Sequence, residues 1–156
     1  MNSLKLPEFT LMGIMLPETT NENEQAMKDC GALWQRFEKE SIYSQIPDKI
    51  SDEVYAVYYA YQGDHTQPYS YFIGCKVADT AETPSGLHKI QIPEDTYLKN
   101  TASGKMPDCV ANAWREIWKS DLDRAYHYDF EVYDQRSQNW EAAEVDIFLS
   151  MKQIDY

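Results

Sequence analysis

Apolar positions in the first half of the chain follow three successive patterns. Residues 9–16 form a nearly continuous apolar run, which is typical of a buried strand. From residue 27 to about residue 41, apolar side chains recur at steps of three and four, which predicts an amphipathic helix. Residues 54–61 and 69–77 are rich in β-branched and aromatic side chains and flank a turn, so they predict a hairpin.

The second half repeats this order. Residues 87–92 and 96–101 are strand-like and are separated by Pro-Glu-Asp. A helix is expected from Pro107, which suits a first helical turn. Its apolar stripe consists of Val110, Trp114, Ile117 and Trp118. Residues 127–133 and 143–151 then predict two final strands.

Short sequence echoes accompany the repeated order. The segment Leu-Trp-Gln-Arg-Phe at 33–37 parallels Ala-Trp-Arg-Glu-Ile at 113–117, and Glu-Val-Tyr at 53–55 recurs at 131–133. Two echoes in the same order favour an internal duplication.

We therefore predict one α+β domain over residues 1–156, with approximate halves 8–78 and 87–151. Each half is a strand-helix-strand-strand unit, related to the other by a pseudo-twofold axis. The expected fold has antiparallel sheets, two main helices and a central cleft.

Composition and charge narrow the choice of partners. The chain has 14 basic and 26 acidic residues, a formal net charge of −12, and this surface repels phosphate backbones. We therefore expect no direct nucleic-acid partner. The 12 Tyr, 5 Phe and 4 Trp exceed what a domain of 156 residues needs to fill its interior, so some rings are expected to line a cavity.

The candidate chemistry favours a binding protein over an enzyme, although it leaves enzymatic activity open. Cys30, Cys75 and Cys109 are far apart and odd in number, which suits a reducing compartment. The start of the chain lacks the apolar region of a signal peptide, and the longest apolar run is too short to span a bilayer. We predict a cytoplasmic protein with no membrane partner. The sequence shows no metal-ligand spacing, cofactor motif or catalytic motif.

Several segments together resemble a known family. The run Asp-Phe-Glu-Val-Tyr at 129–133, followed by 144–149, resembles the carboxy-terminal signature of GyrI-like domains, the bacterial transcription-activator effector-binding family. Other segments resemble its integron-associated, stand-alone branch. They are 21–24 at a helix start, Leu33-Trp34 with Phe37, and the strands 54–58 and 73–77.

The resemblance implies a cleft that binds amphipathic, often cationic, small molecules. The family's functional Glu falls on Glu131, with Tyr133 completing the motif, and this Glu supplies a buried counter-charge to the ligand. Aromatic rings hold the ligand's apolar body. The rings expected to do so here are Trp114, Tyr97, Tyr59, Tyr71, Trp34 and Phe37. Some relatives carry a DNA-binding helix-turn-helix, but only a short tail precedes Phe9, so the resemblance to a transcription-regulation family does not by itself imply direct control of transcription.

Alternation along 127–133 leaves the position of Glu131 open. Tyr128, Phe130 and Val132 share one face, which suits packing against a helix. Glu131 and Tyr133 share the other face, which is directed either to solvent or into the cleft.

Two other functions remain open. Glu131 with Tyr133, aided by Glu53, could polarise a water in a small-molecule hydrolase. Alternatively, the acidic surface could mask a protein partner, as in a topoisomerase modulator.

Overall fold

The computed structural model describes residues 3–152 and consists of one curled antiparallel sheet with two long helices. The strands lie in the order β1-β6-β8-β7-β3-β4-β2-β5. Their bounds are β1 Ser3–Leu6, β2 Phe9–Thr19, β3 Lys49–Tyr59, β4 Tyr69–Val77, β5 His88–Ile92, β6 Asp95–Gly104, β7 Asp129–Tyr133 and β8 Ala143–Ser150. The helices are α1 Gln25–Lys39, the short α2 Ile42–Gln45 and α3 Asp108–Lys119, with single 3₁₀ turns at Glu22–Glu24 and Gln135–Ser137.

The two halves share one topology, which confirms the predicted fold class. In the first half, β2, α1, β3 and β4 give the sheet order β2-β4-β3; in the second, β6, α3, β7 and β8 give β6-β8-β7. The halves meet where β3 pairs antiparallel with β7, with Ala56 opposite Glu131. The middle of the sheet is therefore built from equivalent strands of the two halves.

The edge strands are exchanged between the halves. β1 precedes the first half but pairs with β6, whereas β5 precedes the second half but pairs with β2. The sequence patterns predict only a short tail before Phe9 and place residues 87–92 in the second half. The pairing of β1 and β5 corrects both points.

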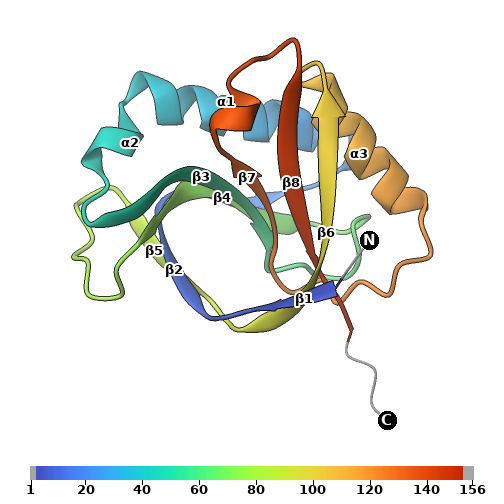
Figure 1. Ribbon diagram of the computed structural model, residues 1–156, viewed down its shortest axis with the longest axis horizontal. Coiled ribbons are helices and arrows are strands. Elements are labelled where there is room, and N and C mark those ends of the chain that lie inside the picture. The colour runs from blue at the N-terminus through green and yellow to red at the C-terminus, as the bar shows by residue number, and fades with distance from the viewer. Residues whose placement is uncertain (1–2, 153–156) are drawn as a thin grey trace.

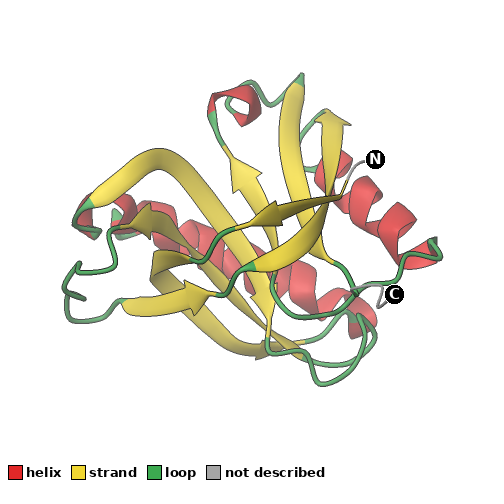
Figure 2. Cartoon of the chain, turned by 60° about the horizontal axis from the view of Figure 1, so that its bottom comes forward, coloured by secondary structure: helices red, strands yellow, loops and turns green. Residues whose placement is uncertain are grey.

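The exchanged strands also explain the curl of the sheet. Residues 7–8 and 93–94 are two-residue links that each join strands from opposite ends of the strand order, so the two edges must lie close together (Figure 1). Both long helices lie on the other side of the sheet, behind the strands in Figure 2. One apolar core therefore fills the curl, and two more lie under α1 and α3.

This arrangement corrects one prediction about β7. Phe130 and Val132 pack inside the curl with Phe9 and Tyr55 and do not face a helix. Both faces of the sheet are covered, one by helices and one by the sheet itself, so an apolar face was no guide to the position of the helices. The other face of β7, which carries Glu131, lies under the helices.

Within residues 3–152, no helix is long and apolar enough to cross a membrane. The same residues contain no group of three or more His, Cys, Asp or Glu side chains arranged to hold a metal ion. Cys30, Cys75 and Cys109 are all free thiols.

Candidate functional site

Glu131 is a buried carboxylate surrounded by aromatic hydrogen-bond donors. Its side chain lies in the middle of β7, and the residue is 1% exposed. Tyr58 Oη and Trp114 Nε1 donate to Oε2 at 2.8 and 2.5 Å, and Tyr133 Oη donates to Oε1 at 2.5 Å. The structure thus rules out a solvated position for this side chain.

Each donor reaches Glu131 because of its place in a regular element. Tyr133 follows Glu131 by two residues on β7, so both point to the same face. Tyr58 lies on the neighbouring strand β3, two residues from Ala56, the register partner of Glu131. Trp114 is on the buried stripe of α3, which lays its indole on the same face. The sheet and the second helix together aim three donors at one carboxylate.

A further group of rings from the first half encloses this centre. Tyr71 of β4 lies beside Tyr58, with ring centroids 5.0 Å apart. Trp34 of α1 donates from Nε1 to Tyr71 Oη at 2.8 Å and meets the Tyr133 ring edge to face at 5.0 Å. Glu131 is therefore enclosed by a close-packed group of rings from five elements, which we call the aromatic chamber: Trp34, Tyr58, Tyr71, Trp114 and Tyr133.

Burial and hydrogen bonding act in opposite directions on this carboxyl. Burial raises the pKa of Glu131, and the hydrogen bonds from Tyr133, Trp114 and Tyr58 partly offset that rise. The pKa values of Tyr58 and Tyr133 are raised well above the ordinary value, first by burial and then by the charge of Glu131. The phenols of Tyr58 and Tyr133 therefore remain protonated donors. None of the ion pairs among residues 3–152 includes Glu131.

A second buried carboxylate lies on the same face of β7. Asp129 is 0% exposed, and its Oδ2 accepts from Arg124 at 2.7 Å and from Tyr61 Oη at 2.7 Å. Ser150 donates to Oδ1 from both its backbone nitrogen and its hydroxyl, at 2.7 and 2.9 Å. The chain itself supplies a cation for Asp129.

An open groove of about 1210 Å³ lies next to the aromatic chamber. Its walls come from α1, the start of β3, the residues before α3 and the β7–β8 connection. Trp34 and Tyr133 belong to the chamber and also line the groove, whereas Glu131 is not among the residues that line the groove. Those two rings therefore separate the open groove from the buried carboxylate.

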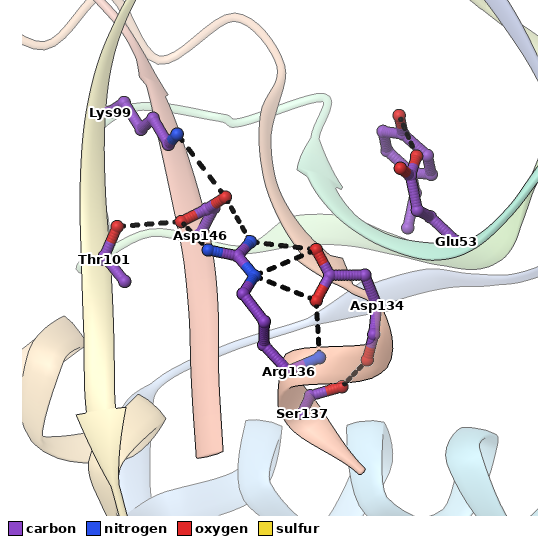
Figure 3. Close-up of polar contacts among 8 residues, drawn as sticks. Glu53, Lys99, Thr101, Asp134, Arg136, Ser137 and Asp146 are labelled. Carbon is purple, nitrogen blue, oxygen red and sulfur yellow. Dashed lines mark hydrogen bonds and ion pairs between the residues drawn. The ribbon is translucent and has the colours of Figure 1, made fainter.

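Arg136 fixes the outer wall of the groove. It binds Asp134 through both Nε and Nη2, with Nη2 at 2.9 Å from Oδ2, and its Nη2 also lies 2.6 Å from Asp146 Oδ2 on β8 (Figure 3). Lys99 and Thr101 contact the same Asp146 from β6. The β7–β8 connection is thereby tied to two neighbouring strands.

The structure brings together some of the predicted ring residues and separates others. Trp114 and Tyr133 bind Glu131 directly, and Tyr71 and Trp34 lie beside them. Phe37 is buried behind Trp34, with ring centroids 6.0 Å apart.

Two of the predicted rings, Tyr97 and Tyr59, lie inside the curl and away from Glu131. Tyr97 packs against Phe130 inside the curl, and Tyr59 stacks on Tyr128 at 5.5 Å on that same side. Strand alternation carries both away from the face of Glu131.

Tyr58 is not among the predicted site residues, although it donates directly to Glu131. The available signal was its position: on a predicted strand, Val54, Ala56 and Tyr58 share one face and Tyr59 takes the other. Choosing between the two tyrosines requires the register between β3 and β7.

Comparison with known proteins places the chain in a family. The family model for integron-associated effector binding protein matches residues 4–150. An integron cassette protein from the mobile metagenome of Vibrio cholerae has a structure with a TM-score of 0.71, 26% identity and coverage of 97% of this chain and 95% of that chain.

Two further proteins share parts of this similarity. A putative transcriptional regulator protein of Bacillus subtilis (strain 168), YobU, is 26% identical over 125 residues, which is 78% of each protein. The structure of SAV2435 bound to tetraphenylphosphonium has a TM-score of 0.78 at 19% identity, covers 97% of this chain and 93% of that chain, and supports the fold. The family match extends over nearly the whole chain, and the protein therefore belongs to the integron-associated effector binding protein family.

Proposed function

We propose that this effector-binding protein captures an amphipathic organic cation in the aromatic chamber, with Glu131 as the counter-charge. The rings of Trp114, Tyr58 and Tyr71 would hold the apolar body of the ligand. A cation over such ring faces gains about 0.5–2 kcal/mol per contact. The proposal agrees with the tetraphenylphosphonium bound by SAV2435, a protein of similar fold.

The observation that carries the proposal is that no basic side chain among the described residues pairs with Glu131. A buried carboxylate is costly unless it is paired with a positive charge. Glu131 has three neutral donors and no basic partner among the described residues, whereas Asp129 on the same strand face has Arg124. A ligand cation would supply the positive charge that the described residues do not place at Glu131.

The groove gives the ligand a route to this carboxylate. Trp34 and Tyr133 form the inner wall of the groove and meet edge to face. A turn of either ring would join the groove to the chamber. The ligand's rings could then replace the ring contacts that close the chamber in the free protein.

Calorimetric titration with tetraphenylphosphonium tests the proposal, with triphenylphosphine oxide as a neutral analogue. We expect saturable binding of the cation, weak or no binding of the neutral analogue, and recovery of the cation unchanged. Glu131→Gln keeps the side-chain shape but removes its charge. It should lower the affinity for the cation by about tenfold or more, equivalent to about 1.4 kcal/mol of binding free energy.

The matched control is Glu116→Gln, which removes one charge from the exposed side of α3. This variant should bind tetraphenylphosphonium about as tightly as the wild type. Equal affinity of Glu131→Gln and Glu116→Gln for the cation would eliminate Glu131 as the counter-charge.

A further inference from the structure

Gly31 is an unexpected residue for the interior of α1, because glycine lowers the stability of a helix relative to alanine. Its backbone is regular helix, so no left-handed conformation requires glycine at this position. Close packing does not require it either. Apart from its chain neighbours and the backbone of its own helix, no atom of residues 3–152 lies within 4 Å of where a Cβ would be. Gly31 lines the groove, so the absent side chain leaves open space in the groove wall.

This open space lies beside the indole of Trp34, which is three residues further along α1 and lines the same groove. Long side chains of a helix point back over the preceding turn, onto the residues three and four positions earlier. For Trp34 these residues are Gly31 and Cys30. Cys30 packs against the core that contains Tyr71, whereas Gly31 is exposed at the groove. The indole therefore has a chamber side and a groove side, and Gly31 leaves the groove side free.

Trp34 is held more weakly than Tyr133, the other ring of the inner groove wall. Tyr133 Oη donates to the carboxylate of Glu131, and a hydrogen bond to a carboxylate is roughly twice as strong as one between neutral groups. Trp34 Nε1 donates at 2.8 Å to the neutral phenol of Tyr71. Displacing Trp34 therefore costs less than displacing Tyr133, and it leaves every hydrogen bond of Glu131 in place.

We propose that Trp34 is the gate between the groove and the aromatic chamber, and that Gly31 is the positioning residue that lets this gate open. To open, the indole changes its rotamer, leaves Tyr71 and lies over Gly31 on the groove side. Helical residues have two common χ1 rotamers, and both direct the side chain over the preceding turn, so the movement leaves α1 intact. This inference rests on the proposed function, because it names the route by which a ligand cation reaches the chamber.

Stopped-flow mixing with tetraphenylphosphonium, followed by tryptophan fluorescence, tests the gate. Gly31→Leu fills the space beside Trp34 with a strong helix former. If Gly31 affected only the helix, this variant would be more stable and would bind the cation at the wild-type rate. We expect it to be more stable but to associate with the cation about tenfold or more slowly, because the leucine forces the indole off its open rotamer. Gly31→Ala should have an intermediate association rate.

Ala32→Leu is the matched control, because Ala32 is the next residue of α1, is exposed and is not among the residues that line the groove. It should associate with the cation at the wild-type rate. The double variant Gly31→Leu/Trp34→Ala distinguishes a closed gate from an obstructed groove, because it keeps the leucine and removes the ring. We expect it to associate at about the rate of Trp34→Ala alone. Circular dichroism checks that each variant is folded.

The outcomes separate the gate from the chamber proposal. A wild-type association rate in Gly31→Leu, or equal slowing in Ala32→Leu, overturns the gate while cation binding in the chamber stands. The gate is also overturned if Gly31→Leu slows association as much in the Trp34→Ala background as in the wild type, since the leucine then obstructs the groove itself. If the wild type does not bind tetraphenylphosphonium, the chamber proposal fails and takes the gate with it.

Discussion

Asp129 and Glu131 lie two residues apart on β7 and are both buried carboxylates, but only Asp129 has a cationic partner among the described residues. Both carboxylates are buried on one face of the strand. Asp129 accepts hydrogen bonds from Arg124, Tyr61 and Ser150, and Arg124 also neutralises its charge. Among residues 3–152, Glu131 accepts from two phenols and an indole and has no basic partner.

The Asp129 side also shows how a cation is held in this environment. The Arg124 guanidinium lies 4.3 Å from the Tyr126 ring centroid and 5.7 Å from that of Trp114, while it pairs with the aspartate. A carboxylate and aromatic faces thus enclose an internal cation. Trp114 borders both compartments, because its ring faces Arg124 and its Nε1 binds Glu131. The Glu131 compartment also has a carboxylate and aromatic rings, but none of the described residues contributes a basic side chain that pairs with Glu131.

The largest effect on stability is expected at Asp129, the carboxylate that is paired with Arg124. Asp129→Asn leaves Arg124 buried without an opposite charge and should lower the free energy of unfolding by about 3–5 kcal/mol, measured by urea denaturation. Glu94→Gln is the control, since it breaks an exposed pair with Lys5 and should change stability by about 0–1 kcal/mol. Similar losses in both variants would show that the buried pair does not carry the difference.

Removing the charge of Glu131 is expected to raise the free energy of unfolding, the opposite of the effect at Asp129. Because burial raises its pKa, the folded chain binds this proton more tightly than the unfolded chain. The free energy of unfolding therefore falls as pH rises from the ordinary Glu range through the raised pKa. Glu131→Gln lacks this fall and should be more stable than the wild type at pH 7, by on the order of 1 kcal/mol.

Denaturation at several pH values measures this second difference. The advantage of Glu131→Gln should shrink toward acid pH, where the wild-type carboxyl is protonated in both states. Destabilisation by Glu131→Gln at neutral pH would indicate that the neutral donors fully compensate the carboxylate, and the contrast with Asp129 would disappear.

The fold was predictable from sequence where patterns were local. The helices and the hairpin of β3 and β4 follow from periodicity and turn residues, and the duplication from repeated order. The exchange of β1 and β5 was not predictable, because it depends on pairing between distant segments. Alternation in β7 separated Phe130 from Glu131 but could not say which residue lies under the helices, since both faces are covered.

At the candidate site, too, the sequence predicts what depends on local patterns but not what depends on pairing between distant strands. Family resemblance selected Glu131 and Tyr133, and the helical stripe supplied Trp114. The prediction of Tyr97 and Tyr59 depends on their rings alone, because the sequence does not give the strand register that sets their faces. The sequence does not distinguish Tyr58 from Tyr59 for the same reason.

Tyr58 and Tyr59 therefore make a matched pair for the smallest predicted effect. Tyr58→Phe keeps the ring but removes one donor from the Glu131 carboxylate, which should lower the free energy of unfolding at neutral pH by about 0.5–1.5 kcal/mol. The loss should be smaller in acid, where Glu131 is neutral and its hydrogen bonds are weaker. Tyr59→Phe should change stability little, because no hydrogen bond of its hydroxyl is found among the described residues.

Urea denaturation of both variants at neutral and acid pH measures this difference. An equal response of the two tyrosines would mean that the donor to Glu131 contributes no net stability. A loss confined to Tyr58→Phe and larger at neutral pH would show that the phenol stabilises the charged form. The protein would then keep its unpaired carboxylate ionised with neutral donors, and the charge of Glu131 would remain available to an incoming cation.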